Sequence, residues 1–152
     1  MEARMTHPAM TVPGAMKALL DLGNSAKGAG VPDEVLDLVN LRASQVNGCG
    51  VCVDMHARSL KKMGESDERV FGVGAWRDMP YYSDAERAAL ALAESVTRLA
   101  DTPDPVPDAV WAEAARHWDG PALSALLVAI AAVNVWNRLN AATHQVAGSI
   151  PL

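Results

Sequence analysis

Residues 47–56 hold the side chains best suited to chemistry in this chain. The two cysteines of the chain, Cys49 and Cys52, are separated by two residues, and His56 follows the second one at a distance of four positions. Helix positions three and four apart share one face, so a helix that begins at about Cys49 aligns two thiols and an imidazole. Asn47-Gly48 signals a turn just before them, and a thiol near a helix N-terminus forms a thiolate more readily. The pattern indicates a redox-active dithiol.

Two other interpretations of these residues stay open. Cys49, Cys52 and His56 could bind zinc with a fourth ligand from His117 or His144, although C-x-x-C zinc sites usually have a second pair of ligands. The cysteines could also be small buried hydrophobic residues, as free cysteines often are. The C-x-x-C spacing beside a turn favours redox chemistry over both, and we expect neither a metal nor a cofactor.

The composition is that of an ordinary globular domain. The chain has 152 residues, of which 50% are hydrophobic and 20% charged, enough for one domain over residues 1–152. Its net charge of −5 disfavours a nucleic-acid partner. The longest apolar run, Ala125–Val133, is too short to span a membrane, and the N-terminus does not resemble a signal peptide. We therefore expect a cytoplasmic protein with no nucleic-acid or membrane partner, in which a C-x-x-C pattern indicates redox or metal chemistry.

Turn and capping signals divide the chain into about six to seven helices. No stretch alternates β-branched and aromatic residues with the period of a strand, so we predict an all-α bundle. Residues 1–13, interrupted by prolines, are expected to be a loose leader, and residues 76–80 a loop. Ser83 and Glu86 match a capping box. The expected helices cover about residues 15–22, 32–46, 49–63, 66–71, 83–100, 108–117 and 121–145.

Residues outside the dithiol complete a longer pattern. Residues 41–49 read Leu-Arg-Ala-Ser-Gln-Val-Asn-Gly-Cys, and Cys52 and Asp54-Met55-His56 follow. Trp76-Arg77, residues 85–94 and residues 134–138 continue the pattern. Together these residues resemble the AhpD-like (alkylhydroperoxidase D-like) branch of the carboxymuconolactone decarboxylase superfamily, from roughly Pro32 to the C-terminus.

The resemblance implies a compact helical bundle of the AhpD-like type, with its core at about residues 32–146. It also implies a homo-oligomer, a trimer or a hexamer built from trimers. The apolar run Ala125–Val133 agrees with this, because a helix that is apolar on all sides is buried in its domain or in a subunit interface. The family has an acidic residue, normally Glu, twelve positions before the first cysteine, and that position is Asp37 here. The best-studied members also carry a His just before the second cysteine, where this chain has Val51.

The dithiol and the resemblance lead to the same chemistry, that of an antioxidant thiol-dependent peroxidase of the alkylhydroperoxidase or peroxiredoxin type. Cys52, four residues before His56, is the better-placed nucleophile, and His56 with Asp37 behind it would take the thiol proton. Attack on a peroxide gives a sulfenic acid, with which Cys49 condenses to form a disulfide. A dithiol protein reductant must then restore both thiols.

Other functions remain open. The chain could be a non-redox decarboxylase or lactone-handling member of the superfamily, although such decarboxylases generally lack the C-x-x-C pattern. It could also be an interaction protein without catalysis. Asp37 could simply complement the helix dipole after Pro32, and His56 could be a hydrogen-bonded structural residue.

Overall fold

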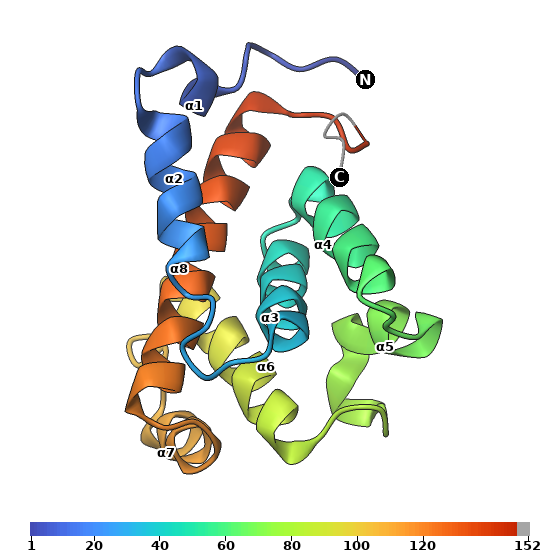
Figure 1. Cartoon of the computed structure of the whole chain (residues 1–152), viewed down its shortest axis with the longest axis vertical. Helices are drawn as coiled ribbons and strands as arrows, with labels where there is room; N and C mark the ends of the chain where they lie inside the picture. Colours follow the sequence, from blue (N-terminus) through green and yellow to red (C-terminus); the bar gives the residue numbers. More distant parts are fainter. Residues whose placement is uncertain (149–152) are drawn as a thin grey trace.

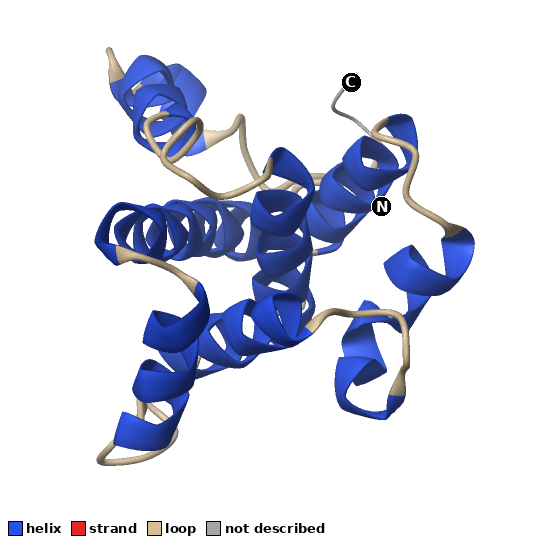
Figure 2. Cartoon of the chain, turned by 60° about the horizontal axis from the view of Figure 1, so that its bottom comes forward, coloured by secondary structure: helices blue, strands red, loops and turns tan. Residues whose placement is uncertain are grey.

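The computed structural model describes residues 1–148, which form helices and connecting loops without a strand (Figures 1 and 2). The expected all-α class is confirmed. Residues 149–152, the end of the expected domain, lie outside the described part. The helices are α1 (Pro8–Thr11), α2 (Ala15–Asn24), α3 (Asp33–Val46), α4 (Gly50–Lys62), α5 (Asp67–Gly72), the 3-10 helix η1 (Val73–Asp78), α6 (Asp84–Thr97), α7 (Asp108–His117) and α8 (Gly120–Thr143).

Helix α3 lies at the centre of the bundle and contacts α4, α6 and α8 (Figure 1). One face of α3 joins the main core, which it shares with α6, α7 and α8 through buried residues such as Val39, Leu92 and Leu126. Its other face carries Leu38 and Leu41 into a second core under α4, α5 and η1. Because both faces of α3 are buried, packing holds the helix in one position, and any side chain that it presents to α4 has a defined place.

Helix α8 is the long apolar helix expected near the C-terminus. Among the described residues it alone has the length and composition to cross a membrane, but 56% of its apolar stretch is buried inside the molecule. Within the run 125–133, Ala131 alone is exposed, and the other side chains are buried or partly buried. Most of the apolar surface of this run is therefore used in the core of the chain itself.

The expectation of a loose leader over residues 1–13 is wrong. Pro8 is the first residue of α1, a position where its missing N–H costs no hydrogen bond. His7 caps this helix, since its Nδ1 accepts the N–H of Ala9 at 3.1 Å. The backbone N–H of Arg4 donates to the carbonyl oxygen of Thr143 at 2.9 Å. The segment is thus attached to the end of α8.

The loop expected at residues 76–80 is also partly wrong, because residues 73–78 form η1. Trp76 is buried there, and its indole N–H donates to Glu94 at 3.0 Å. With α1 included, residues 1–148 contain eight α-helices rather than six to seven. The capping box at Ser83 and Glu86 is present.

Glu94 on α6 joins three elements. Its carboxylate accepts from Arg42 of α3 at 2.6 Å and from Arg77 of η1 at 2.7 Å, besides the Trp76 indole. Burial would raise the pKa of Glu94, but the hydrogen bonds from Arg77, Trp76 and Arg42 outweigh it and hold this pKa below its ordinary value. The network fixes α3 against α6 and η1.

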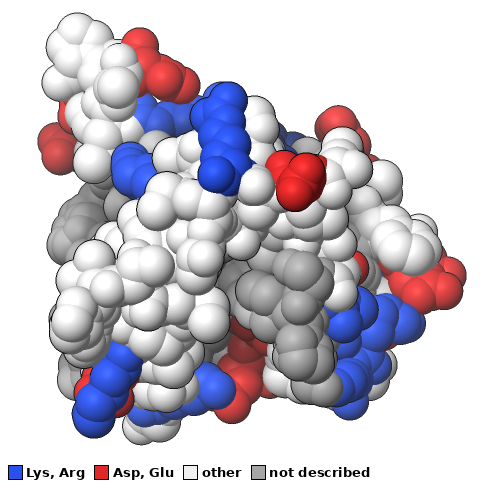
Figure 3. All heavy atoms as spheres, turned by 90° about the horizontal axis from the view of Figure 1, so that it is seen from above, with Lys and Arg blue, Asp and Glu red and all other residues white. Residues whose placement is uncertain are grey.

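The charged side chains form no single-sign area on the face that Figure 3 shows. Acidic and basic side chains are interspersed there.

Candidate functional site

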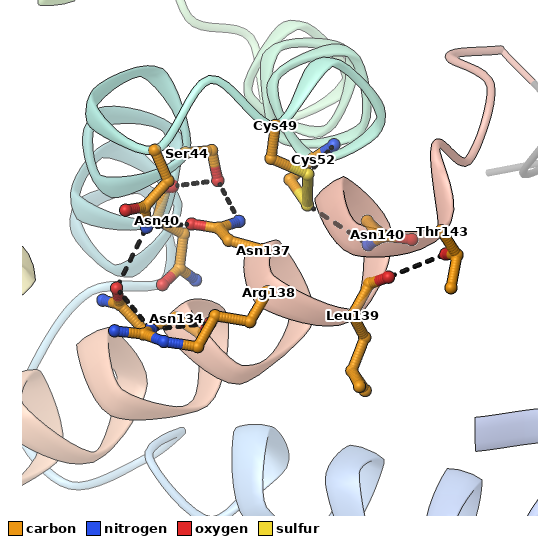
Figure 4. The surroundings of a disulfide bond; sticks show 11 residues. Asn40, Ser44, Cys49, Cys52, Asn134, Asn137, Arg138, Leu139, Asn140 and Thr143 are labelled. Atoms are coloured by element: carbon orange, nitrogen blue, oxygen red, sulfur yellow. Dashed lines mark hydrogen bonds between the residues drawn. A yellow bond between two sulfur atoms is a disulfide. The ribbon is translucent and has the colours of Figure 1, made fainter. Parts of the chain in front are cut away.

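The two cysteines lie at the start of α4 and are joined by a disulfide bond (Figure 4). Cys49 is the N-cap residue of α4, and its Sγ accepts the N–H of Cys52 at 3.4 Å. The side-chain amide of Asn140 on α8 donates to Cys52 Sγ at 3.3 Å. Both cysteines are buried. In the reduced protein, the helix N-terminus and this amide donor would both stabilise a thiolate.

The turn before α4 is fixed by side-chain amides. Gly48 has a φ of 66°, a conformation that glycine adopts without steric cost. The Asn47 amide donates to Asn134 at 2.9 Å and to Asn137 at 2.8 Å, both on α8. Asn137 in turn donates to Ser44 on α3 at 3.0 Å (Figure 4). These bonds set the position of the dithiol relative to α3 and α8.

His56 and Asp37 are in direct contact across the interface of α4 and α3. His56 Nδ1 lies 2.9 Å from Asp37 Oδ1, and the Ser59 hydroxyl donates to Asp37 Oδ2 at 2.5 Å. Because a carboxylate only accepts hydrogen bonds, neutral His56 carries its proton on Nδ1. Its Nε2 then holds the lone pair of a general base.

The Asp37 carboxyl group is held in its charged form. Burial would raise the pKa of Asp37, but the hydrogen bond and the charge of His56, the Ser59 hydroxyl and the positive charge of Lys27 outweigh it and lower this pKa. Asp37 is therefore a carboxylate at neutral pH and orients the His56 ring.

Two cavities meet at His56. The larger, of about 510 Å³, has Cys52, Val51 and Asn140 in its wall, whereas Cys49 does not line it. The smaller, of about 380 Å³, has Asp37 in its wall. His56 lines both, so its ring lies between the cavity that Cys52 lines and the Asp37 carboxylate.

The structure brings together the residues that the sequence singled out and adds others. Cys52 and His56 line one cavity, and Asp37 contacts His56. Ser59 was missed, although its place three residues after His56 on α4 puts it on the same helix face. Asn140 and the cavity-lining His7 were also missed, and since they lie far from the dithiol in sequence, no local pattern indicates them.

The alternative of a zinc site has no ligand set in the described part of the chain. Within residues 1–148, no group of three or more His, Cys, Asp or Glu side chains is placed to hold a metal ion. The two histidines considered as a fourth zinc ligand have other positions and contacts. His117 Nε2 is 3.1 Å from Glu113 on the same helix, and His144 is the C-cap residue of α8.

Several known sequences are similar to this chain. The profile of the carboxymuconolactone decarboxylase family matches residues 13–95, which include the dithiol, Asp37 and His56. The uncharacterised protein YdfG of Bacillus subtilis is 34% identical over 137 residues, which cover 90% of this chain and 92% of YdfG. The alkyl hydroperoxide reductase AhpD of Solibacter usitatus is 44% identical over 57 residues, covering 38% of this chain and 32% of that protein.

Solved structures share the fold. Atu0492 from Agrobacterium tumefaciens, a protein of unknown function named as a candidate AhpD antioxidant defence protein, superimposes with a TM-score of 0.88 at 32% identity over 99% of both chains. The debrominase Bmp8 has a TM-score of 0.80 at 22% identity, over 90% of this chain and 73% of Bmp8, and shows the likeness of the fold alone. The chain is a member of the carboxymuconolactone decarboxylase family and belongs to its AhpD-like branch.

Proposed function

We propose that the protein is a thiol-dependent peroxidase that reduces peroxides through Cys52 and Cys49. The observation that carries this proposal is the position of Cys52, which forms a disulfide with Cys49 and shares a cavity wall with His56, whose base nitrogen is set by Asp37. A nucleophile, a base and a group that orients the base form the usual arrangement of an activated thiol.

The reaction begins with the reduced dithiol. His56 Nε2 takes the proton of the Cys52 thiol, and the thiolate attacks the terminal oxygen of the peroxide. The S–O bond forms as the O–O bond breaks, which gives a sulfenic acid on Cys52 and an alkoxide that takes the proton from His56 and leaves as the alcohol. The Cys49 thiol then displaces water from the sulfenic acid, and the disulfide forms.

The cavity supports an organic hydroperoxide as the substrate. Its volume of about 510 Å³ is in the usual range for small-molecule sites. Its wall is largely apolar and includes Met10, Met16, Met55 and Trp136. Hydrogen peroxide would use little of this surface, whereas an alkyl or aryl group would bury itself against it.

The cycle requires a second protein. A dithiol reductant restores Cys49 and Cys52 by thiol–disulfide exchange, as the reducing environment of the cytoplasm would allow. Reduction of the peroxide needs no cofactor, since the two thiols supply both electrons. An antioxidant role follows from these two half-reactions.

Thiol titration tests the proposal. The reduced protein is mixed with one equivalent of cumene hydroperoxide, and free thiols and cumyl alcohol are measured. We expect both thiols to be lost and one equivalent of alcohol to form, whereas the Cys49→Ser/Cys52→Ser double variant should form none. If the thiols persist, the peroxidase proposal fails, and a non-redox decarboxylase, a lactone-handling enzyme or an interaction protein takes its place.

A further inference from the structure

Helix α2 is amphipathic, yet none of its residues is buried. Leu19 and Leu20 follow Met16 at three and four positions, so these three apolar side chains share one face. Such a face normally packs into a core, but Leu20 is 51% exposed. Helix α2 contacts α8 and runs beside it in Figure 1. The apolar face of α2 therefore lies on the bundle without being buried by it.

Both cavities of the candidate site lie against this face of α2. Met16 lines the larger cavity, Leu19 and Gly23 line the smaller one, and Leu20 lines both. An apolar side chain is stabilised when atoms pack against it and water is removed from its surface. The apolar face of α2 thus gains its full burial when an apolar molecule lies in the cavities.

The two cavities follow one another along the helices that enclose them. Along α4 the wall passes from Cys52 in the larger cavity to Ser59 in the smaller one, and along α8 it passes from Asn140 to Ala132. Four residues from α2, α4 and α8 line both cavities: Leu20, Met55, His56 and Trp136. The cavities therefore lie end to end between these three helices, and the four shared side chains form their junction.

His56 lies within this pair of cavities rather than at one end of it. Its side chain is 11% exposed and lines both cavities, so a molecule in either one reaches it. On α8 the walls extend from Ala129 to Asn140, roughly 16 Å at a rise of 1.5 Å per residue. Trp136, which belongs to the junction, lies between these two residues. A molecule that occupies both cavities therefore has a part on each side of the atom that meets His56.

The wall of the smaller cavity accommodates an apolar chain. The Asp37 carboxylate already accepts hydrogen bonds from His56 and Ser59. Three further polar residues of the wall are exposed and stay in contact with water: Asn24, Lys27 and Asp33. Opposite α2, the wall includes apolar residues of α3 and α8: Leu36, Ala129, Ala132 and Val133. An apolar chain in this cavity packs between these residues and α2.

We propose that the substrate is an unbranched, lipid-like hydroperoxide whose peroxide group is inside the chain, with one arm of the chain in each cavity. The proposal rests on the proposed peroxidase function for the peroxide group and adds the class of substrate. One arm lies against Met16 in the larger cavity, and the other lies against Leu19 and Ala132 in the smaller one. The side chains of Leu20 and Met55 rotate at the junction to let the chain pass.

A substitution at Gly23 closes the smaller cavity from the side of α2. Gly23 shares the face of Leu19 and Leu20, and a Cβ atom at this position would meet no atom within 4 Å. Gly23→Leu therefore fills the smaller cavity without a clash, and because leucine forms helices better than glycine, it should melt no lower than the parent. The matched control is Ala18→Leu, which adds a leucine at an exposed position of α2 that lines neither cavity.

The probes are 6-undecanol, an unbranched chain with its hydroxyl group in the middle, and cumyl alcohol, a compact molecule that the larger cavity alone can hold. Each is titrated into the oxidised protein, and binding is followed by tryptophan fluorescence, since Trp136 lines both cavities. We expect Gly23→Leu to weaken binding of 6-undecanol by on the order of 50-fold, because about three methylene groups lose their site and each contributes roughly a factor of four. Cumyl alcohol should bind to Gly23→Leu as it does to the parent, and Ala18→Leu should bind both probes normally.

Three results would overturn the proposal: equal binding of 6-undecanol to Gly23→Leu and the parent, equal weakening of both probes by Gly23→Leu, or no binding of 6-undecanol to the parent. Because the oxidised protein is used, none of these results depends on peroxide turnover. If Gly23→Leu weakens binding of 6-undecanol alone, in a protein that fails to consume cumene hydroperoxide, the result supports an unbranched ligand across both cavities and contradicts the peroxidase function instead.

Discussion

Asp37 contacts two residues of α4 at once, and this makes it the most informative single side chain behind the dithiol. Asp37→Asn keeps the shape and removes the charge that orients His56. General-base assistance is typically worth about 100-fold to 10,000-fold, and we expect a loss somewhat below that range, since water can replace part of the carboxylate. The measurement is the pH dependence of Cys52 alkylation in a Cys49→Ser background.

Two matched variants serve as controls for Asp37→Asn. Asp37→Glu restores the residue that the family usually has and should be tolerated. Asp33→Asn removes an exposed acid in the first turn of the same helix, so it tests the helix dipole alone, worth about 0.3–1 kcal/mol of stability. Superimposable alkylation profiles for Asp37→Asn and the parent would make Asp37 a structural acid.

The lowered pKa of Asp37 also determines how the stability of the protein should depend on pH. Its pKa in the folded protein lies below the ordinary value of 3.8. A lowered pKa means that its contribution to stability is complete above the unfolded-state pKa and is lost as the pH falls through the folded-state pKa. The difference in unfolding free energy between the parent and Asp37→Asn should therefore be present above pH 4 and shrink as the pH falls below it. Urea unfolding measures it, and a difference that grows below pH 4 would contradict this.

At the residue scale, spacing in the sequence predicted only the site residues that share one helix. The spacing of Cys52 and His56 is a property of α4, so their common face followed directly from the chain. Asp37 lies on another helix, and only the resemblance to the AhpD-like branch pointed to it. His7 is brought to the cavity by the attachment of residues 4–5 to the end of α8, a contact across nearly the whole sequence. No local pattern encodes such a contact.

Among the elements, Glu94 holds α3, and with it Asp37, in place. Glu94→Gln would leave Arg42, whose side chain is 15% exposed, without its counter-charge. Removing one partner of a buried ion pair is strongly destabilising, and we expect a loss of about 3 kcal/mol in unfolding free energy, measured by urea denaturation.

The matched control for this loss is Glu113→Gln on α7. Glu113 pairs with Arg116, and 43% of its side chain is exposed. Pairs on the surface contribute roughly 0–1 kcal/mol. If both substitutions lower the unfolding free energy by the same amount, the network around Glu94 does not hold α3 in place.

The elements that local signals define were predicted well. The helix over 108–117 has the expected bounds, and the capping box begins α6 where Ser83 and Glu86 placed it. Residues 1–13 were misjudged because Pro8 was taken as a breaker, whereas at the first position of a helix it is favourable. The helix η1 was missed because its order depends on burial of Trp76 beside Glu94, which is a tertiary contact.

For the whole molecule, the prediction of a trimer or a hexamer remains to be tested. The apolar run 125–133 now gives this prediction less support, since most of its side chains are already buried within the chain itself. Large apolar side chains nevertheless stay exposed, including Phe71 at 76% and Leu99 at 56%. Multi-angle light scattering should give a mass three or six times the 16.1 kDa of one chain. A stable monomer at micromolar concentration would refute this prediction.

The central claim is that Cys52 attacks the peroxide and Cys49 resolves the product. Cys52, unlike Cys49, lines the larger cavity together with His56. The most direct measurement treats reduced Cys49→Ser and Cys52→Ser with one equivalent of cumene hydroperoxide and dimedone, followed by mass spectrometry and assay of cumyl alcohol. We predict that Cys49→Ser forms one equivalent of alcohol with the dimedone adduct on Cys52, and that Cys52→Ser forms neither. An adduct on Cys49 of Cys52→Ser, with none on Cys52 of Cys49→Ser, would contradict the account.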